Sequence, residues 1–281
     1  MRAASAGTHP FAVWQEIVVS AGERYQFVYG SMRELARREP TFGLHVHVGV
    51  PDAERAIHAA NRLRAELPLL LALSVNSPFW QGRDTGLGSA RTPLFQAFPR
   101  VGVPRAFHTY EEYVESVDVL IRSGAVPEPT FLWWDVRPQP RFGTVEVRIM
   151  DAQTTLADTA ALAALVQSIV RLEVEDGAHT YDQGVPPEVL NENRFLAARD
   201  GMEAKLIVPD LDERIPARSL LEDLLLLCRP HAEALGCGTE LDSIHRLADR
   251  TGAHRQLELS RSLGSLPRVV AVLADDFLAG A

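Results

Sequence analysis

Two histidines separated by one residue, His45 and His47, are a first group of side chains whose type and spacing could do chemistry. Residues 41–50 around them alternate between apolar and polar or small residues, which is the period-two pattern of a half-buried strand. The apolar side consists of Leu44, Val46 and Val48. A pair of imidazoles on one strand face can bind a transition metal, but His-x-His pairs also occur in ordinary strands.

A second polar group follows the same alternation later in the chain. Residues 130–138 and 143–151 each have a strand pattern, and the short connection between them predicts a β-hairpin. The polar sides consist of Trp133, Asp135 and Arg137 in the first strand, and of Glu146, Arg148 and Met150 in the second. If the histidine strand joins this hairpin, one face of the sheet becomes core and the other becomes a polar cavity.

Such a face has a defined chemistry. Imidazole and carboxylate groups bind divalent cations, with Glu146 the harder and therefore better ligand for Mg²⁺. Arginines beside them bind phosphate or carboxylate oxygens through their planar forks. A simpler interpretation stays open, in which Glu146 and Arg148 form a cross-strand ion pair on a solvated face.

Helices and loops must position these strands. Helical spacing is found in residues 22–39, which end before a proline, and in residues 53–66, 111–123, 160–175, 187–200, 217–235 and 239–251, with a last stretch after Gly252. An apolar stretch at 68–75 leads into a loop at 76–90 that is rich in glycine and small polar residues. Strands lie early and helices late, so we predict an α+β fold in a single domain over residues 1–281.

Composition excludes several classes of protein. The 281 residues contain 28 Lys and Arg against 37 Asp and Glu, a formal net charge of −9 that disfavours nucleic acid as a partner. Two cysteines provide no disulfide framework. The apolar run 67–75 is too short to span a bilayer, and the first residues lack the apolar segment of a signal peptide. We therefore expect a cytoplasmic protein with no membrane partner.

Three sequence blocks are more specific than any single residue. They are GLHVHVGVPD at 43–52, LPLLLALSVNSPFWQGRDTGLGSARTPLF at 67–95 and WWDVRPQPRFGTVEVRIMDAQTT at 133–155, with fainter AGTHPFAVW near the start and RTGAHRQ at 250–256. In this order the chain resembles the type 2 glutamate–cysteine ligase family, the carboxylate–amine ligases, over nearly its whole length.

The resemblance implies a glutamine synthetase-like fold, with an antiparallel sheet curved around the active site, flanking helices and a mostly helical C-terminal half. It also implies that ATP phosphorylates the γ-carboxylate of glutamate and that an amine, cysteine or another, attacks the acyl phosphate. ATP and Mg²⁺ would be the cofactors, and amino acids or amines the small-molecule partners. Positioning and electrostatics would then provide most of the catalysis.

The resemblance also assigns roles to residues. Glu146 and His45 would lie at the metal, Arg148 would contact phosphate, and Arg91 would hold a substrate carboxylate. Asn76, Ser77 and Trp80 would line the substrate pocket. The remaining members of the polar face, His47, Asp135 and Arg137, would bind substrate or nucleotide.

The sequence departs from the family pattern at one point, and this departure leads to alternative hypotheses about function. The family begins with a glutamate-rich strand that provides most magnesium ligands, and no such strand occurs before residue 40, so we expect an N-terminally shortened domain. The second hypothesis is therefore a catalytically weak or inactive homologue that acts as a binding or interaction protein. A third is a metal hydrolase with His108, His179 or Asp151 as further ligands. A homodimer through the apolar segment 219–230 is also open, although that stripe could be core.

Overall fold

Three short strands form the sheet on which the predicted polar residues lie. Strand β7 (Thr144–Val147) lies between β1 (Val46–Gly49) and β6 (Val136–Gln139), and both pairings are antiparallel. This computed structural model describes residues 2–37, 41–177 and 185–279. The β6–β7 hairpin and the early position of the sheet agree with the sequence prediction, and the fold class is α+β.

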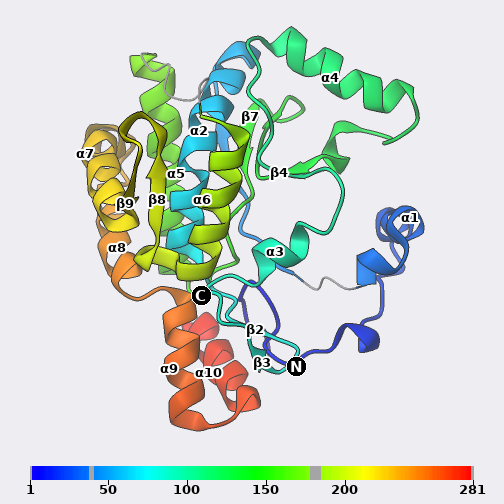
Figure 1. The fold of residues 1–281 in the computed structure, drawn as a ribbon, viewed down its shortest axis with the longest axis vertical. Helices are drawn as coiled ribbons and strands as arrows, with labels where there is room; N and C mark the ends of the chain where they lie inside the picture. The colour runs from blue at the N-terminus through cyan, green and yellow to red at the C-terminus, as the bar shows by residue number, and fades with distance from the viewer. Residues whose placement is uncertain (1, 38–40, 178–184, 280–281) are drawn as a thin grey trace.

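One face of this sheet is core. Val136, Val145 and Val147 are fully buried there. Helix α2 (Ala53–Ser74) packs on β6 and β7, and helix α5 (Leu156–Asp176) packs on α2 and β1. Figure 1 shows α2 between α5 and β7. The predicted alternation of segment 41–50 therefore holds, with its apolar side turned toward the helices.

Helix α2 is longer than the sequence predicts. It begins at the N-cap Asp52, whose side chain accepts a hydrogen bond of 2.8 Å from the backbone N–H of Arg55, and it continues through Pro68 to Ser74. A proline inside a helix costs about 3 kcal/mol. The surrounding leucines are almost completely buried and offset this cost: Leu67, Leu69, Leu70, Leu71 and Leu73.

The C-terminal half is mostly helical, as predicted. It contains α6 (Pro187–Asp200), α7 (Ala217–Leu235), α8 (Gly238–Asp249), α9 (Gly252–Leu263) and α10 (Leu266–Ala279). Helices α7 and α8 pack on α5, and α9 with α10 forms a helical hairpin at the lower end of the molecule in Figure 1. A hairpin of β8 (Lys205–Val208) and β9 (Glu213–Pro216) between α6 and α7 was not predicted.

Short elements complete the fold. They are η1 (Trp14–Glu16), α1 (Glu23–Met32), η2 (Arg33–Arg37), β2 (Phe79–Trp80), β3 (Arg83–Asp84), α3 (Arg91–Phe95), β4 (Val101–Gly102), α4 (Tyr110–Arg122), η3 (Pro129–Phe131), β5 (Trp133–Trp134), η4 (Gly201–Glu203) and η5 (Pro209–Leu211). Strands β4 and β5 pair in parallel, while β2 and β3 form a hairpin within the predicted loop. None of the helices in the described ranges could cross a bilayer.

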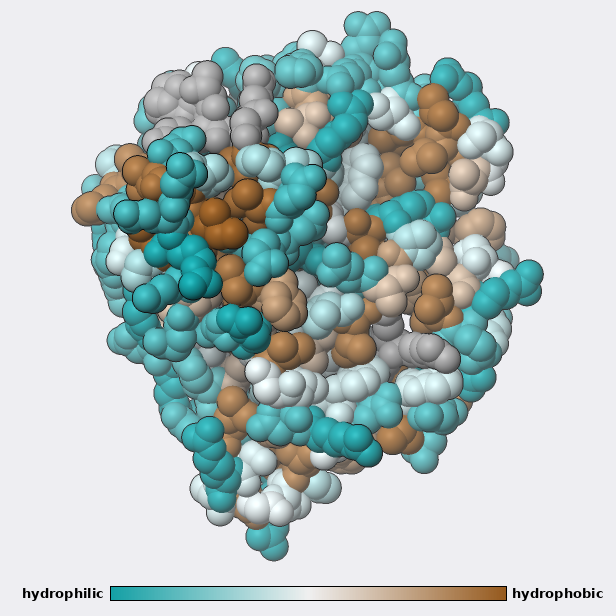
Figure 2. All heavy atoms as spheres, viewed as in Figure 1, coloured by the Kyte–Doolittle hydropathy of each residue, from teal (hydrophilic) through white to brown (hydrophobic). Residues whose placement is uncertain are grey.

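The apolar segment 219–230, considered above as a dimer contact, lies in helix α7 and is partly buried and partly exposed. Leu221, Leu224 and Leu225 point into the core, whereas Leu226 and Leu227 are 74% and 53% exposed. Figure 2 shows hydrophobic residues grouped over the region of α7 and the β8–β9 hairpin. Most of the stripe is therefore core, and the homodimer stays a prediction.

Candidate active site

The strand register places the predicted polar residues in rows on one face of the sheet. In β1, His47 lies opposite Glu146 of β7, and in β6, Arg137 lies opposite the same Glu146. His45 immediately precedes β1, and its ring lies 3.2 Å from the Arg148 guanidinium, measured from Nδ1 to Nη1. Five of the predicted residues therefore form one cluster, which we call the polar face: His45, His47, Arg137, Glu146 and Arg148.

Glu146 is the centre of the polar face. Its side chain is only 3% exposed. Oε2 accepts hydrogen bonds from Arg137 Nε at 2.8 Å and Gln139 Nε2 at 3.1 Å. Oε1 accepts from Arg148 Nη1 and lies 3.5 Å from both His45 Nδ1 and His47 Nε2.

Gln139 belongs to this site although the sequence analysis did not identify it. It is the last residue of β6, two positions after Arg137, so both side chains lie on one face. The predicted strand ended one residue earlier, at Pro138. The period-two spacing from Arg137 was the signal that could have found it.

The electrostatics of the polar face are set by burial and by two arginines. Burial alone would raise the pKa of Glu146, but Arg148 and Arg137 hold that pKa at about 2. Burial, together with the Arg148 charge, lowers the pKa of His45 to about 3. At neutral pH the face therefore contains one carboxylate, two guanidinium cations and a neutral His45 imidazole.

His47 is held by its neighbours in a fixed orientation. Its Nδ1 lies 3.0 Å from the hydroxyl of Thr144 in β7, and its ring meets the edge of Phe142 with 5.9 Å between centroids. These contacts leave Nε2 directed at Glu146. The His47 side chain is 35% exposed and that of His45 is 40% exposed, so the histidine side of the face is open to solvent.

Asp135 and Arg137 do not pair with each other. Asp135 forms an ion pair with Arg194 of α6, with 2.8 Å between Oδ2 and Nε. The geometry between these two atoms is not that of a hydrogen bond. Arg137 Nη1 donates to the carbonyls of Thr130, at 3.1 Å, and Leu132. Asp135 therefore ties helix α6 to the sheet, and Arg194 carried no signal in the sequence.

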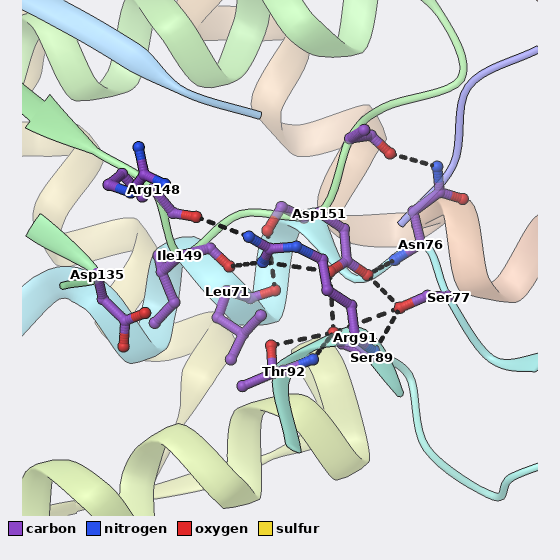
Figure 3. A network of polar contacts seen from close by, with 12 residues as sticks. Leu71, Asn76, Ser77, Ser89, Arg91, Thr92, Asp135, Arg148, Ile149 and Asp151 are labelled. Carbon is purple, nitrogen blue, oxygen red and sulfur yellow. Dashed lines mark hydrogen bonds and ion pairs between the residues drawn. The ribbon is translucent and has the colours of Figure 1, made fainter. Parts of the chain in front are cut away.

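Arg91, the first residue of α3, points into the protein (Figure 3). Its Nη1 donates to the carbonyl of Ile149 at 2.8 Å, and its Nη2 donates to the carbonyl of Arg148 at 3.0 Å. The Asp151 carboxylate lies 3.8 Å from Nη1. Both terminal nitrogens of the guanidinium thus bind the backbone of the segment that follows β7, and the contact of Arg91 with a substrate carboxylate stays a prediction.

Asp151 is the hub of this buried network. It is completely buried and accepts hydrogen bonds from Ser77 Oγ at 2.6 Å, Ser89 Oγ at 2.9 Å and the backbone N–H of Asn76 at 2.8 Å (Figure 3). Burial raises the pKa of Asp151, and the charge of Arg91 with these donors opposes that rise.

Asn76 and Ser77 are interior residues, and their place in the lining of a substrate pocket stays a prediction. Both are completely buried. The Asn76 side chain donates to the carbonyl of Ala152 at 2.8 Å and accepts from Gln256 Nε2 of α9 at 2.8 Å. A Cβ on Gly252 would lie 2.1 Å from Asn76 Oδ1, so only glycine fits there. The faint block at 250–256 thus anchors the loop.

Trp80 behaves differently from these two residues. It is half-buried in β2 and pairs with Arg83 of β3. The role of Trp80 in substrate binding stays a prediction.

The described residues do not by themselves form a metal site. No group of three or more His, Cys, Asp or Glu residues with metal-binding geometry occurs among them. Mg²⁺ prefers six oxygen ligands, and Glu146 offers one carboxylate whose two oxygens already accept from arginines. The residues in hand therefore do not fit a Mg²⁺ ion held by the protein alone.

The metal hydrolase hypothesis gains no ligands from this geometry. Both carboxylate oxygens of Asp151 accept hydrogen bonds in the buried network. The backbone N–H of His108 donates to Glu112 at the start of α4, and His179 lies outside the described residues.

Comparison with a solved structure identifies the class of fold. A crystal structure of glutamate–cysteine ligase from Francisella tularensis in complex with AMP superposes with a TM-score of 0.56 at 14% identity, covering 80% of this chain and 58% of that one. The chain thus has the fold of a glutamate–cysteine ligase.

Comparison of sequences identifies the family. The family described as glutamate-cysteine ligase family 2 matches residues 1–271, and the chain belongs to this family. A protein named "Putative glutamate--cysteine ligase 2-1" from Rubrobacter xylanophilus is 44% identical over 278 residues, 97% of this chain and 72% of that protein. A similarly named protein from Sorangium cellulosum is 42% identical over 272 residues, 96% of this chain and 72% of that protein. The resemblance seen in the sequence is thereby confirmed.

Proposed function

We propose that this chain is an ATP-dependent carboxylate–amine ligase that activates the γ-carboxylate of glutamate as an acyl phosphate for attack by an amine. Membership of a ligase family supports the reaction class. The AMP complex of the solved structure with the same fold supports a nucleotide as the second substrate. The acceptor is cysteine or another amine.

Arg148 is the observation that carries this proposal. Its guanidinium is fixed by Glu146 through Nη1, while its Nε is buried without a hydrogen-bond partner among the described residues. An unsatisfied buried donor is costly, and an oxygen of a phosphate would satisfy it with a charge-assisted bond. Arg148 thus fits the role of holding a transferring phosphoryl group, where positioning and charge provide the rate enhancement.

The other residues of the polar face support that role. Glu146 contacts both arginines and fixes them, and Gln139 in turn donates a hydrogen bond to Glu146. His45 is a poor general base at neutral pH because its pKa is lowered to about 3. Its neutral imidazole is suited instead to accept a hydrogen bond or to bind a cation that arrives with the nucleotide, and Mg²⁺ in that role rests on the family resemblance.

Turnover with a panel of amines tests the proposal. The purified chain is incubated with ATP, Mg²⁺ and glutamate, together with cysteine, other amines or hydroxylamine, and ADP and the coupled product are measured. We expect ADP formation that requires both glutamate and an amine, and γ-glutamyl hydroxamate with hydroxylamine, which traps an acyl phosphate.

Two variants sharpen this test. Arg148→Lys keeps the charge but loses the planar fork and should lower turnover, whereas Arg122→Lys at the end of α4 should not. Absence of ADP with every amine, from protein that is folded, would exclude the ligase.

A binding protein is the second candidate, because Glu146 alone offers a carboxylate to a metal on the polar face. Calorimetry that detects ATP binding by a chain without turnover would support it. Loss of that binding in Arg148→Lys would place the nucleotide on the polar face.

A further inference from the structure

A second polar cavity, which shares no lining residue with the polar face, lies between helices α5, α8, α9 and α10. It is found where the α9–α10 hairpin joins the rest of the molecule (Figure 1). Its volume of about 440 Å³ is that of a small-molecule site. Three arginines line it, and we call it the arginine cavity: Arg246 of α8, Arg250 between α8 and α9, and Arg255 of α9. We infer that the arginine cavity binds a small anion that carries a phosphate or carboxylate group.

The three arginines are held in place by carboxylates, and each keeps a free donor. Arg246 donates through Nη2 to a carboxylate of α5 at 2.8 Å. Arg250 binds Glu258, and Arg255 binds Asp276, in both cases through Nε and Nη2. The Nη1 groups of all three arginines have no hydrogen-bond partner within the described part of the chain. Each guanidinium is therefore already oriented by a carboxylate, while its Nη1 can still donate to an anion.

Two helices begin at the same cavity. Helix α5 begins at Leu156 after the N-cap Thr155, and α9 begins at Gly252 after the N-cap Thr251. The backbone N–H groups of Ala157 and Gly252, which both line the cavity, have no hydrogen-bond partner among the residues that the structure describes. Free N–H groups and the partial positive charge of a helix N-terminus favour an anion. The two helix ends thus add donors to those of the arginines.

The charges that line the cavity leave a small positive surplus. Two carboxylates, those of Asp158 and Asp276, stand against the three arginines. The whole chain has a formal net charge of −9, so a local surplus of positive charge is a place where an anion gathers. A surplus of this size, with donors from several elements, suits a small anion with one or two charged groups and does not suit a polyanion.

The sequence block at 250–256 has two sides. Gly252 and Gln256 hold Asn76 of the loop, as described above. Arg250 and Arg255 of the same block line the arginine cavity. Anchoring of the loop needs only the first pair, whereas the two arginines are placed to hold a ligand. Because Gly252 both lines the cavity and packs on Asn76, a bound anion would lie one residue away from the loop.

An NMR titration locates the ligand. Spectra of the purified chain are recorded with inorganic phosphate, pyrophosphate and citrate at equal ionic strength, since salt screens exposed charges. The backbone N–H resonances of Ala157 and Gly252 should move, because a charge-assisted hydrogen bond deshields the proton, whereas that of Glu111 in the first turn of α4 should not. Movement with the phosphates alone identifies a phosphate ligand, and movement with citrate alone identifies a carboxylate. No movement at either N–H with any of the three anions at millimolar concentration would overturn the inference.

Two variants test the arginine donors. Arg246→Gln and Arg250→Gln each remove a guanidinium from a side chain that is 58% and 52% exposed, respectively, so both variants should fold. Each should weaken anion binding in calorimetry by about tenfold, because a hydrogen bond from a charged group is lost. The matched control is Arg261→Gln in the last turn of α9, outside the cavity, which should change the affinity less than about twofold. Equal losses in all three variants would show that only the overall charge acts, and would contradict a site.

A variant of the polar face separates the two places where an anion could bind. Phosphate can also bind the polar face if the proposed function holds, but Arg148 does not line the arginine cavity. Arg148→Lys should therefore leave the shifts of Ala157 and Gly252 unchanged. If Arg148→Lys abolishes anion binding while Arg246→Gln does not, the anion lies on the polar face and the inference is wrong. No turnover is needed for this result, so a chain that forms no ADP would refute the ligase and leave the arginine cavity to be judged by binding alone.

Discussion

Replacing Glu146 with glutamine should destabilise the folded protein by about 3 kcal/mol at pH 7. Glutamine has the shape of the protonated carboxyl group, so the substitution removes the charge and little else. The pKa of Glu146 lies at about 2 against an ordinary 4.5, and each unit of pKa corresponds to about 1.4 kcal/mol. The side chain is 3% exposed, so solvent screens this interaction little.

The pH dependence of this difference is as informative as its size. Because the folded pKa lies below the unfolded value, the carboxylate stabilises the protein fully above 4.5, and the stabilisation is lost as the pH falls toward about 2. The variant lacks this contribution at every pH. The two proteins should therefore differ in stability at pH 7 and approach each other in acid.

Urea denaturation, followed by circular dichroism at several pH values, measures this difference. Glu115→Gln on α4 is the matched control, because Glu115 is exposed, and its effect should stay within about 0.5 kcal/mol. A loss below about 1 kcal/mol for Glu146→Gln at pH 7, or a loss independent of pH, would show that Arg137 and Arg148 do not hold the carboxylate as argued.

Three further predictions follow from other parts of the chain. The His45→Asn variant should lose less stability than the wild type as the pH falls from 6.5 to about 3. In this range the unfolded wild type binds a proton at His45, whereas the folded protein does not, because its His45 pKa is lowered to about 3. Denaturation midpoints at pH 7 and in mild acid test this. Gly252→Ala should lower stability by about 2 kcal/mol, because the new Cβ meets Asn76, whereas Gly30→Ala in exposed helix α1 should raise it by about 0.5 kcal/mol; thermal unfolding compares them. Cys228 should resist alkylation in the native protein, since burial raises the pKa of its thiol to about 12; mass spectrometry after iodoacetamide treatment would detect any reaction.

The polar face could be predicted from the sequence because a strand encodes its two faces directly. Alternation placed His45 and His47 on one side of their strand and Glu146 on one side of its own, and the register confirms the expectation that the two sides share a face if the strands pair. The hairpin was equally visible because its two strands are adjacent in the sequence. The faces of each strand and the hairpin needed only information from within a few residues, whereas the pairing of β1 with β7 joins distant segments.

Contacts between distant segments could not be predicted in this way. Nothing local to Asp135 indicates that Arg194 of α6 is its partner, and nothing local to Asn76 indicates Gln256 of α9. Asn76 was predicted to line a pocket, and the internal partners of its amide could not be predicted from its neighbours in the sequence. Pro68 suggested a helix end, but burial of the leucines around it outweighs the local cost.

The order of strands in the sheet also has a consequence for how the site assembles in time. Arg137 and Glu146 are nine positions apart, whereas His47 and Thr144 are 97 positions apart. Closing a long loop costs more entropy than closing a hairpin, and non-local pairing is slow. The arginine side of the polar face should therefore form early in folding and the histidine side late. Pulsed hydrogen exchange would detect this order as protection of β6 and β7 before β1.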